Sequence, residues 1–210
     1  MSAAIVVPWR GGVPSREAAW AKVRAAYDDY GLPVVTGDSD PALPFNLRQA
    51  RNRVAEAAGY VDAYVFNDAD IIVPRDSMLA AIDLALDRCV AVWPADRAAV
   101  RDHVTGEDSD QRLFVGGTIV VPRVLFEAVG GWDERFVGYG WEDYAFRDML
   151  HHLSGRIERV PGHALWFNHE RRADETEEGR TSPLLDRYKA LRTSGDVYRM
   201  ADEVRAARTP

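Results

Sequence analysis

Short apolar segments alternate with longer segments of helical pattern along most of the 210 residues, and this alternation is the feature that most limits the fold. Runs such as residues 4–7 and 63–67 are too short for buried helices and have the length of strands covered on both faces. Strands that alternate with helices favour an α/β sandwich with a mostly parallel sheet. Ligands of such sheets bind beyond the carboxyl ends of the strands.

The periodicity predicts the position of each element. Strands are expected at residues 4–7, 33–36, 63–67, 89–93, 113–121, 156–160 and 164–169. Helices are expected at residues 14–30, 46–58, 77–87, 123–129, 141–153, 183–192 and 197–208, with Asn46 as an N-cap. Residues 94–112 are charged and without clear periodicity, so we expect a mobile surface loop there. Residues 170–182 are very polar and are expected to be loose.

Composition excludes several classes of protein. The net charge of −7 argues against a general nucleic-acid or membrane-surface binder, and no apolar run reaches the length of a membrane-spanning helix. The single cysteine, Cys89, allows no disulfide within the chain, which fits a reducing compartment. It lies in an apolar stretch, which predicts a small core residue. The first residues lack the pattern of a signal peptide, so we expect a cytoplasmic protein.

Asp68 and Asp70 follow directly after the apolar strand at residues 63–67. Two buried, unpaired carboxylates would be costly, and a divalent cation such as Mg²⁺ or Mn²⁺ would remove that cost. If residues 68–70 remain extended, both side chains point to the same side. The alternative is a surface turn with solvated acids.

Glycines flank an aromatic residue at 138–140, and two acids, Glu142 and Asp143, follow at the start of a predicted helix. Acids in a first helical turn are favoured by the helix dipole, so simple capping explains them. A functional interpretation is a general base at a flexible, aromatic-walled site. His163 and His169, near the end of the last predicted strand, are candidate metal ligands or ordinary structural residues.

Six motifs in order resemble the β-1,4-galactosyltransferase family. Segment 5–10 resembles its opening strand and Pro-aromatic-Arg turn, and segment 45–50 resembles its Phe-Asn-Arg helix. Segment 65–74 is similar to its Asp-Val-Asp region, and segment 114–117 to its Phe-Gly-Gly strand. Segment 130–143 resembles its Gly-Phe to Glu-Asp-Asp-Asp block, and segment 166–169 its metal-binding Met-x-x-His. The order and approximate spacing agree from about residue 3 to residue 170.

The resemblance implies a GT-A fold, a three-layer α/β/α sandwich with a mixed, mostly parallel sheet. It divides a single domain into a nucleotide-binding half at residues 1–93, an acceptor and catalytic half at residues 113–170, and C-terminal helices at residues 183–210. It also implies inverting, metal-dependent transfer from a nucleoside-diphosphate sugar, a UDP-sugar by analogy, to a hydroxyl of a glycan, lipid-linked, protein or small-molecule acceptor.

Residue roles carry over from the same motifs. Asp70 and His169 would be metal ligands, and Asp68 would contact the ribose or the surroundings of the metal. Asp143, with Glu142, would orient and deprotonate the acceptor hydroxyl. The implied donor-binding residues are Pro8, Trp9, Arg10, Phe45, Arg48, Asp68, Gly116 and Gly117, and the implied acceptor-binding residues are Tyr139, Gly140, Trp141 and Glu142.

This sequence also departs from the family pattern. Trp166 stands in the place of the metal-ligating Met, and Tyr144 in the place of the third acid. The family's secretory anchor and disulfides are missing, which suggests a microbial or viral relative. Three alternatives remain open: a sugar-phosphate nucleotidyltransferase with Gly11-Gly12 as its phosphate loop, a non-catalytic module that binds a nucleotide sugar or glycan, and a structural domain.

Overall fold

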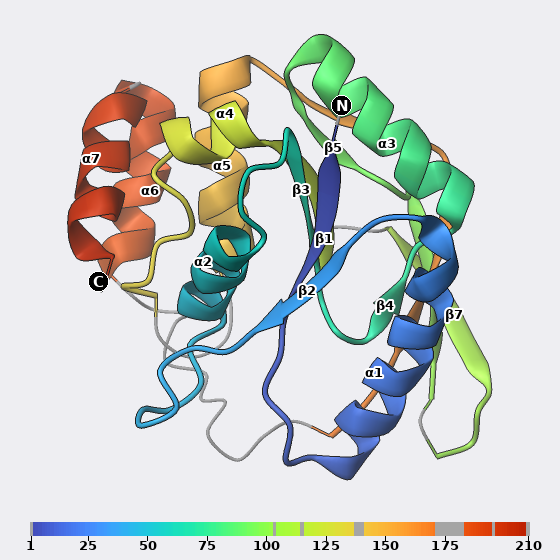
Figure 1. Ribbon diagram of the computed structural model, residues 1–210. Helices are drawn as coiled ribbons and strands as arrows, with labels where there is room; N and C mark the ends of the chain where they lie inside the picture. Colours follow the sequence, from blue (N-terminus) through green and yellow to red (C-terminus); the bar gives the residue numbers. More distant parts are fainter. Residues whose placement is uncertain are drawn as a thin grey trace.

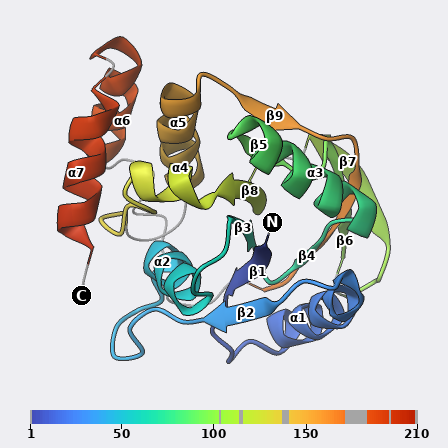
Figure 2. The same ribbon diagram turned by 45° about the horizontal axis from the view of Figure 1, so that its top comes forward.

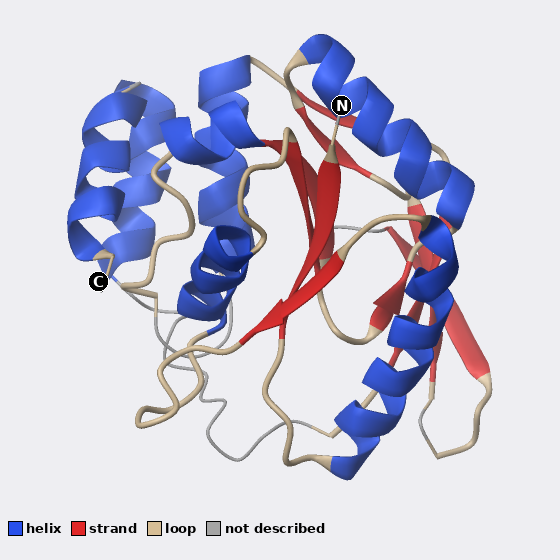
Figure 3. Ribbon diagram, viewed as in Figure 1, coloured by secondary structure: helices blue, strands red, loops and turns tan. Residues whose placement is uncertain are grey.

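The computed structural model describes residues 2–102, 104–113, 116–136, 141–170, 183–194 and 196–208 (Figure 1, Figure 3). Its strands are β1 (Ala3–Pro8), β2 (Val34–Gly37), β3 (Ala63–Asn67), β4 (Ile71–Ile72), β5 (Ala91–Trp93), β6 (Arg97–Arg101), β7 (Asp108–Leu113), β8 (Thr118–Pro122), β9 (Ile157–Arg159) and β10 (His163–Phe167). Its helices are α1 (Pro14–Tyr27), the 3₁₀ turn Asp28–Tyr30, α2 (Leu47–Ala57), α3 (Arg75–Arg88), α4 (Arg123–Ala128), α5 (Glu142–Ser154), α6 (Pro183–Ser194) and α7 (Val197–Ala207).

The larger sheet has the strand order β2-β1-β3-β8-β5-β9 within the described part of the chain. β1 runs parallel to β2 and β3, and β5 runs parallel to β9. β8 runs antiparallel to both of its neighbours, β3 and β5. The sheet is therefore mixed with a parallel majority, as expected.

Helices cover both faces of this sheet, and alternate residues of one strand serve the two cores. In β1, Ile5 and Val7 pack with residues of α1 and α3, whereas Ala4 and Val6 pack with residues of α2, α4 and α5. α6 and α7 lie outside α5 and α4, on the side of the sheet away from α1 and α3 (Figure 2). The three-layer sandwich is confirmed, with the two C-terminal helices added to one side.

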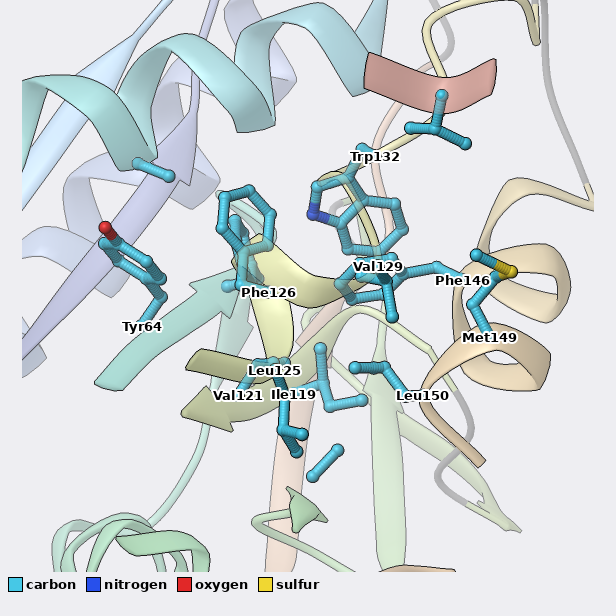
Figure 4. Close-up of a cluster of buried hydrophobic side chains, with 14 of the residues drawn as sticks. Tyr64, Ile119, Val121, Leu125, Phe126, Val129, Trp132, Phe146, Met149 and Leu150 are labelled. Carbon is cyan, nitrogen blue, oxygen red and sulfur yellow. The ribbon is translucent and has the colours of Figure 1, made fainter. Parts of the chain in front are cut away.

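A group of aromatic rings lies within the core between the larger sheet and α4 and α5, among aliphatic side chains (Figure 4). The rings of Trp132 and Phe146 stack with their centroids 3.8 Å apart. Phe66 of β3 makes edge contacts with both rings. These rings form the floor under the candidate site described below.

A smaller sheet, of strand order β4-β10-β6-β7, corrects the expected surface loop at residues 94–112. β6 pairs in parallel with β10 and antiparallel with β7. An ion pair of 2.7 Å joins Arg101 to Asp108 across the hairpin, and Asp102 accepts backbone hydrogen bonds within its turn. The sequence did not predict these strands because they lack an alternating apolar pattern. They are stabilised instead by pairing with β10 and by the ion pair across the hairpin.

Cys89 was also misplaced by the sequence argument. It ends α3 in a left-handed conformation, with φ of 51°, and its side chain is exposed. The apolar neighbours that suggested a core position belong to the buried faces of α3 and β5 on either side of this turn. Asn46, in contrast, is confirmed as the N-cap of α2, because its side chain accepts from the backbone N–H groups of Arg48 and Gln49.

Candidate active site

The candidate site begins at the carboxyl end of β3, where a buried polar network bends the chain. The Asn67 amide donates to the carbonyl oxygens of Asp68 and Ile71 at 2.7 and 3.0 Å. Its own oxygen accepts from the hydroxyl groups of Tyr27 and Thr118 at 2.9 and 2.6 Å. Residues 69–70 consequently form a turn, so the extended geometry assumed from the sequence is wrong. The two carboxylates of Asp68 and Asp70 therefore face different neighbours.

Asp70 lies against the end of β10. Its Oδ2 accepts from the indole Nε1 of Trp166 at 2.7 Å and lies 3.1 Å from Nε2 of His169. The backbone N–H of Phe167 also donates to the Asp70 carbonyl, at 2.8 Å. The structure thus brings Asp70 and His169 together, although almost half of the chain separates them. Trp166 cannot coordinate a metal, and here its indole instead orients the Asp70 carboxylate.

The other ring nitrogen of His169, Nδ1, lies 2.7 Å from the carbonyl oxygen of Glu170. When Nδ1 carries the hydrogen, Nε2 presents its lone pair on the side of Asp70, which is the arrangement of a metal-binding histidine. Burial works against a charged ring, but the hydrogen bonds to Asp70 and Glu170 outweigh it and raise the pKa of His169.

A carboxylate oxygen and an imidazole nitrogen that converge in this way fit a cation such as Mn²⁺. Among the residues that the structure describes, no group of three or more acidic, histidine or cysteine side chains is arranged for a metal. The protein would therefore supply two ligands, Asp70 and His169, and the phosphates of a ligand and water would supply the others.

Asp68 belongs to a different cluster, centred on a residue that the sequence argument missed. Arg51 of α2 donates from Nη2 to Asp68 and from Nη1 to Asp143, each at 2.8 Å. Its guanidinium lies over the ring of Trp132, 4.1 Å from the centroid. Burial alone would lower the pKa of Arg51, but the carboxylates of Asp68 and Asp143 raise it, so the side chain stays charged. Burial also raises the pKa of Asp68.

Arg48, one helical turn before Arg51, approaches Glu142. Its Nη2 lies 3.5 Å from Glu142 Oε2, and both residues are buried, with 1% and 5% of their surfaces exposed. Burial raises the pKa of Glu142, and the charge of Asp143 adds to this effect. α2 and the first turn of α5 are thus joined by two arginines on one helical face. That spacing of Arg48 and Arg51 was the signal available in the sequence.

Gly116 and Gly117 lie directly against the acidic side chains. Both have positive φ, 85° and 74°, a conformation that side chains rarely tolerate. A Cβ at Gly116 would lie 3.1 Å from Oδ2 of Asp143, and one at Gly117 would lie 2.2 Å from the side chain of Ile71. The described neighbours of the two glycines are protein side chains, those of Asp143, Asp68 and Ile71.

A pocket with an empty volume of about 490 Å³, partly open to solvent, adjoins these residues. Its polar lining includes Arg51, Asp143 and Arg147, and its floor includes the stacked rings of Trp132 and Phe146. Gly116, Gly117, Trp93 and Tyr144 are further lining residues. Asp143 therefore faces a cavity in which a hydroxyl group can approach it.

Two exposed aromatic rings flank Asp143 in the sequence. Trp141 and Tyr144 are 36% and 44% exposed, and their ring centroids are 5.3 Å apart. Trp141 has φ of 69°, and strained backbone of this kind is enriched at functional sites. The predicted acceptor residues Tyr139 and Gly140 lie outside the described residues.

The predicted donor residues near the N-terminus lie at the same edge of the sheet. Val6 pairs with Phe66 in the parallel register, so Pro8 and Asp68 follow at neighbouring strand ends. Arg10 donates from Nε to both oxygens of Asp38, at 2.9 and 2.8 Å, and from its other nitrogens to the 39–43 segment. The Arg10 guanidinium is therefore already committed to this loop.

Of the remaining predicted residues, Phe45 and Trp9 lie near Arg10, whereas His163 lies at the far end of β10. Phe45 lies beneath Arg10, with its ring 5.4 Å from the guanidinium carbon, and Trp9 packs on Trp20 with centroids 5.8 Å apart. His163 is the first residue of β10, exposed and at the opposite end of the strand from His169. The structure excludes His163 from the Asp70 cluster.

Comparisons with known proteins identify the fold. Residues 100–172 match the family described as the N-terminal domain of galactosyltransferase. A mutant of Drosophila β1,4-galactosyltransferase 7, in complex with manganese, UDP-Gal and xylobiose, superposes with a TM-score of 0.53 at 18% identity, covering 75% of this chain and 64% of the other. The search of curated proteins found no match.

Two further solved structures share the fold. GalNAc-T7 with UDP, GalNAc and Mn²⁺ gives a TM-score of 0.61 at 12% identity, over 97% of this chain and 54% of that one. S. aureus TarS 1-349 with UDP-GlcNAc gives 0.52 at 12% identity, over 98% and 71%. The chain thus spans less than two thirds of the Drosophila and GalNAc-T7 chains.

The fold is the GT-A fold that these glycosyltransferase structures share. Over residues 100–172 the chain is specifically similar to the galactosyltransferase family, so the resemblance inferred from the six motifs is confirmed. No helix in the described portions is long and apolar enough to cross a membrane.

Proposed function

We propose that this protein transfers a sugar, with inversion, from a nucleoside-diphosphate sugar to an acceptor hydroxyl, in a reaction that depends on a divalent cation. The observation that carries the proposal is that Asp70 and His169 lie 3.1 Å apart. Asp68 of the same turn and Asp143 are both ion-paired with Arg51. The complex of the Drosophila enzyme with manganese and UDP-Gal, and that of GalNAc-T7 with UDP, GalNAc and Mn²⁺, support a UDP-sugar as the donor and Mn²⁺ as the cation. Inversion follows from the family resemblance.

Asp143 is the proposed general base. Its carboxylate lines the pocket and is 37% exposed, so an acceptor hydroxyl can reach it. Asp143 accepts the proton of the hydroxyl as the oxygen attacks the anomeric carbon, and the nucleoside diphosphate leaves from the opposite side. Proton transfer of this kind typically contributes roughly 10²–10⁴-fold to the rate. Glu142 is buried beside Arg48, and the orienting role implied for it by the family resemblance stays part of the proposal.

Asp70 and His169 would hold the cation, which when bound supplies Lewis-acid neutralisation of the leaving diphosphate. Trp166 keeps the Asp70 carboxylate in position for this role through its indole hydrogen bond. Trp141 and Tyr144 provide exposed aromatic surface next to the base, suited to the apolar face of a sugar ring.

The nucleotidyltransferase alternative is disfavoured by the loop after β1. A phosphate loop needs backbone N–H groups free to meet the phosphates. Here the N–H of Gly12 donates to the carboxylate of Glu17 at 2.9 Å, which places negative charge where a phosphate would bind. The Arg10 side chain beside it is held by Asp38.

The test is a thermal-shift screen of nucleotide sugars with and without Mn²⁺, followed by a transfer assay with the donor that stabilises the protein most. We expect stabilisation that requires both donor and cation, transfer to a hydroxyl acceptor, and NMR of the product showing the inverted anomer. Binding without transfer or donor hydrolysis would instead identify a binding module. Release of pyrophosphate from a nucleoside triphosphate would identify a nucleotidyltransferase.

A further inference from the structure

The guanidinium of Arg51 occupies the space between the carboxylate proposed as base and the first carboxylate of the Asp68–Asp70 turn. We propose that Arg51 is a positioning residue: it fixes the orientation of the Asp143 carboxylate and ties it, through Asp68, to the turn that carries Asp70. The inference rests on the proposed function, in which Asp143 is the base.

The geometry of Arg51 is that of a rigid bridge. Its two terminal nitrogens serve different carboxylates, Asp68 and Asp143, at equal distances of 2.8 Å. A guanidinium is planar, so the two hydrogen bonds fix both carboxylates relative to one another. The side chain is 3% exposed and lies on the ring of Trp132, which limits its own movement.

The bridge also distinguishes the two oxygens of Asp143. Oδ1 accepts from Arg51, whereas Oδ2 lies next to Gly116, where an added Cβ would approach it to 3.1 Å. Oδ2 therefore remains for an acceptor hydroxyl, in a position set by Arg51 on one side and by the Gly116 backbone on the other. A misplacement of about 1 Å at a reacting group can cost roughly 100-fold in rate.

Arg51 could also act only by neutralising the charge of the two acids. Substitution by lysine distinguishes that role from positioning of Asp143. The single ammonium group of Arg51→Lys keeps a positive charge but cannot hold two carboxylates in one plane. If Arg51 only neutralises the acids, Arg51→Lys should match the wild type in transfer, donor affinity and melting temperature. If Arg51 positions Asp143, lysine restores folding and donor binding but not the rate of transfer.

The experiment measures transfer, donor affinity and melting temperature for Arg51→Lys, Arg51→Gln, Asp143→Asn and the double variant Arg51→Gln/Asp143→Asn. Arg53→Gln is the matched control, since Arg53 lies on the same helix and takes part in neither ion pair. We expect kcat to fall about 100-fold in Arg51→Gln. We expect Arg51→Lys to retain most of the donor affinity and melting temperature, with kcat still lowered at least about tenfold.

The double variant tests whether Arg51 acts through Asp143. If it does, Arg51→Gln reduces transfer no further once Asp143→Asn is present, because residues that act as one unit are not additive. The double variant also removes one of the two carboxylates that Arg51→Gln would leave unpaired. If Arg51→Gln fails to fold, Arg51→Lys, which keeps the positive charge, still carries the test.

Full recovery of kcat in Arg51→Lys, or multiplicative losses in the double variant, would overturn the positioning role. Absence of transfer in the wild type would count against the proposed function instead. In that case a crystal structure of Arg51→Lys decides the inference, which predicts that Oδ2 of Asp143 leaves its place beside Gly116. An unmoved Asp143 carboxylate in that structure would refute the role of Arg51.

Discussion

Asp68 and Asp70 are separated by one residue, yet the carboxylate of Asp68 pairs with an arginine, whereas that of Asp70 contacts an indole and an imidazole. Asp68 already holds a cation, because the buried guanidinium of Arg51 donates to it. Asp70 is held by the neutral indole of Trp166 and by His169, whose ring can bind either a proton or a metal. The comparison suggests that only the Asp70 side is built to accept a cation from solution, whereas the Asp68 side serves the base.

The largest effect on transfer is expected from a substitution of the proposed base. Asp143→Asn keeps the size of the side chain but cannot accept a proton, so transfer should fall by roughly 10²–10⁴-fold. Donor binding, measured by calorimetry with Mn²⁺, should remain close to that of the wild type. Unchanged transfer in this variant would reject Asp143 as the base.

A somewhat smaller effect is expected from a substitution at the proposed metal site. Asp70→Ala removes the carboxylate that meets His169, and cation-dependent donor binding should weaken by at least about 100-fold. Calorimetry with and without Mn²⁺ measures the change, and His163→Ala, at the other end of β10, should bind like the wild type. Tight binding of a nucleoside diphosphate without any divalent cation would contradict the assignment.

Trp166→Phe keeps an aromatic ring at this position, although a smaller one, and removes the indole N–H that orients Asp70. Loss of a group that orients a metal ligand typically costs 10–100-fold in metal affinity, and we expect a value of roughly tenfold here. Titration of the apparent Mn²⁺ affinity in the transfer assay measures it. An affinity equal to that of the wild type would mean that Trp166 is only a packing residue.

The smallest effect is expected from Gly116→Ala, with Gly59→Ala as its control. Both glycines have positive φ, 85° and 68°, so each substitution should cost about 1–2 kcal/mol in the free energy of unfolding. Only at Gly116 would the new methyl group press on Asp143, while nothing lies within 4 Å at Gly59. Denaturant unfolding should therefore show similar losses, but transfer should fall several-fold in Gly116→Ala alone.

Much of the larger sheet was predictable because its signal is local. β1 and β3 are fully buried apolar runs, and Asn46 begins α2 with a side-chain cap that the sequence shows directly. The hairpin of β6 and β7 was missed, since its pairing with β10 is non-local and its residues are mostly polar. Local pattern carries no record of such pairing.

The candidate site divides in the same way. Asp70, His169 and Asp143 were singled out by residue type and motif order, and the structure places each of them around the expected sheet edge. Their roles in metal binding and proton transfer remain predictions. Arg51 was missed because an arginine on an amphipathic helix is usually solvated. Its spacing from Arg48 was visible in the sequence, but its burial against Trp132 was not.

By itself, the sequence determined the alternation of strands and helices, the sheet edge at which the acids gather, and the resemblance to galactosyltransferases. Only the tertiary structure decided how those acids are partnered. Asn67 turns the chain so that Asp68 meets Arg51, while β10 brings Trp166 and His169 to Asp70. The physical reason is that the partner of a buried charge is set by which elements pack together, and the side chains two residues apart on one turn reach different elements.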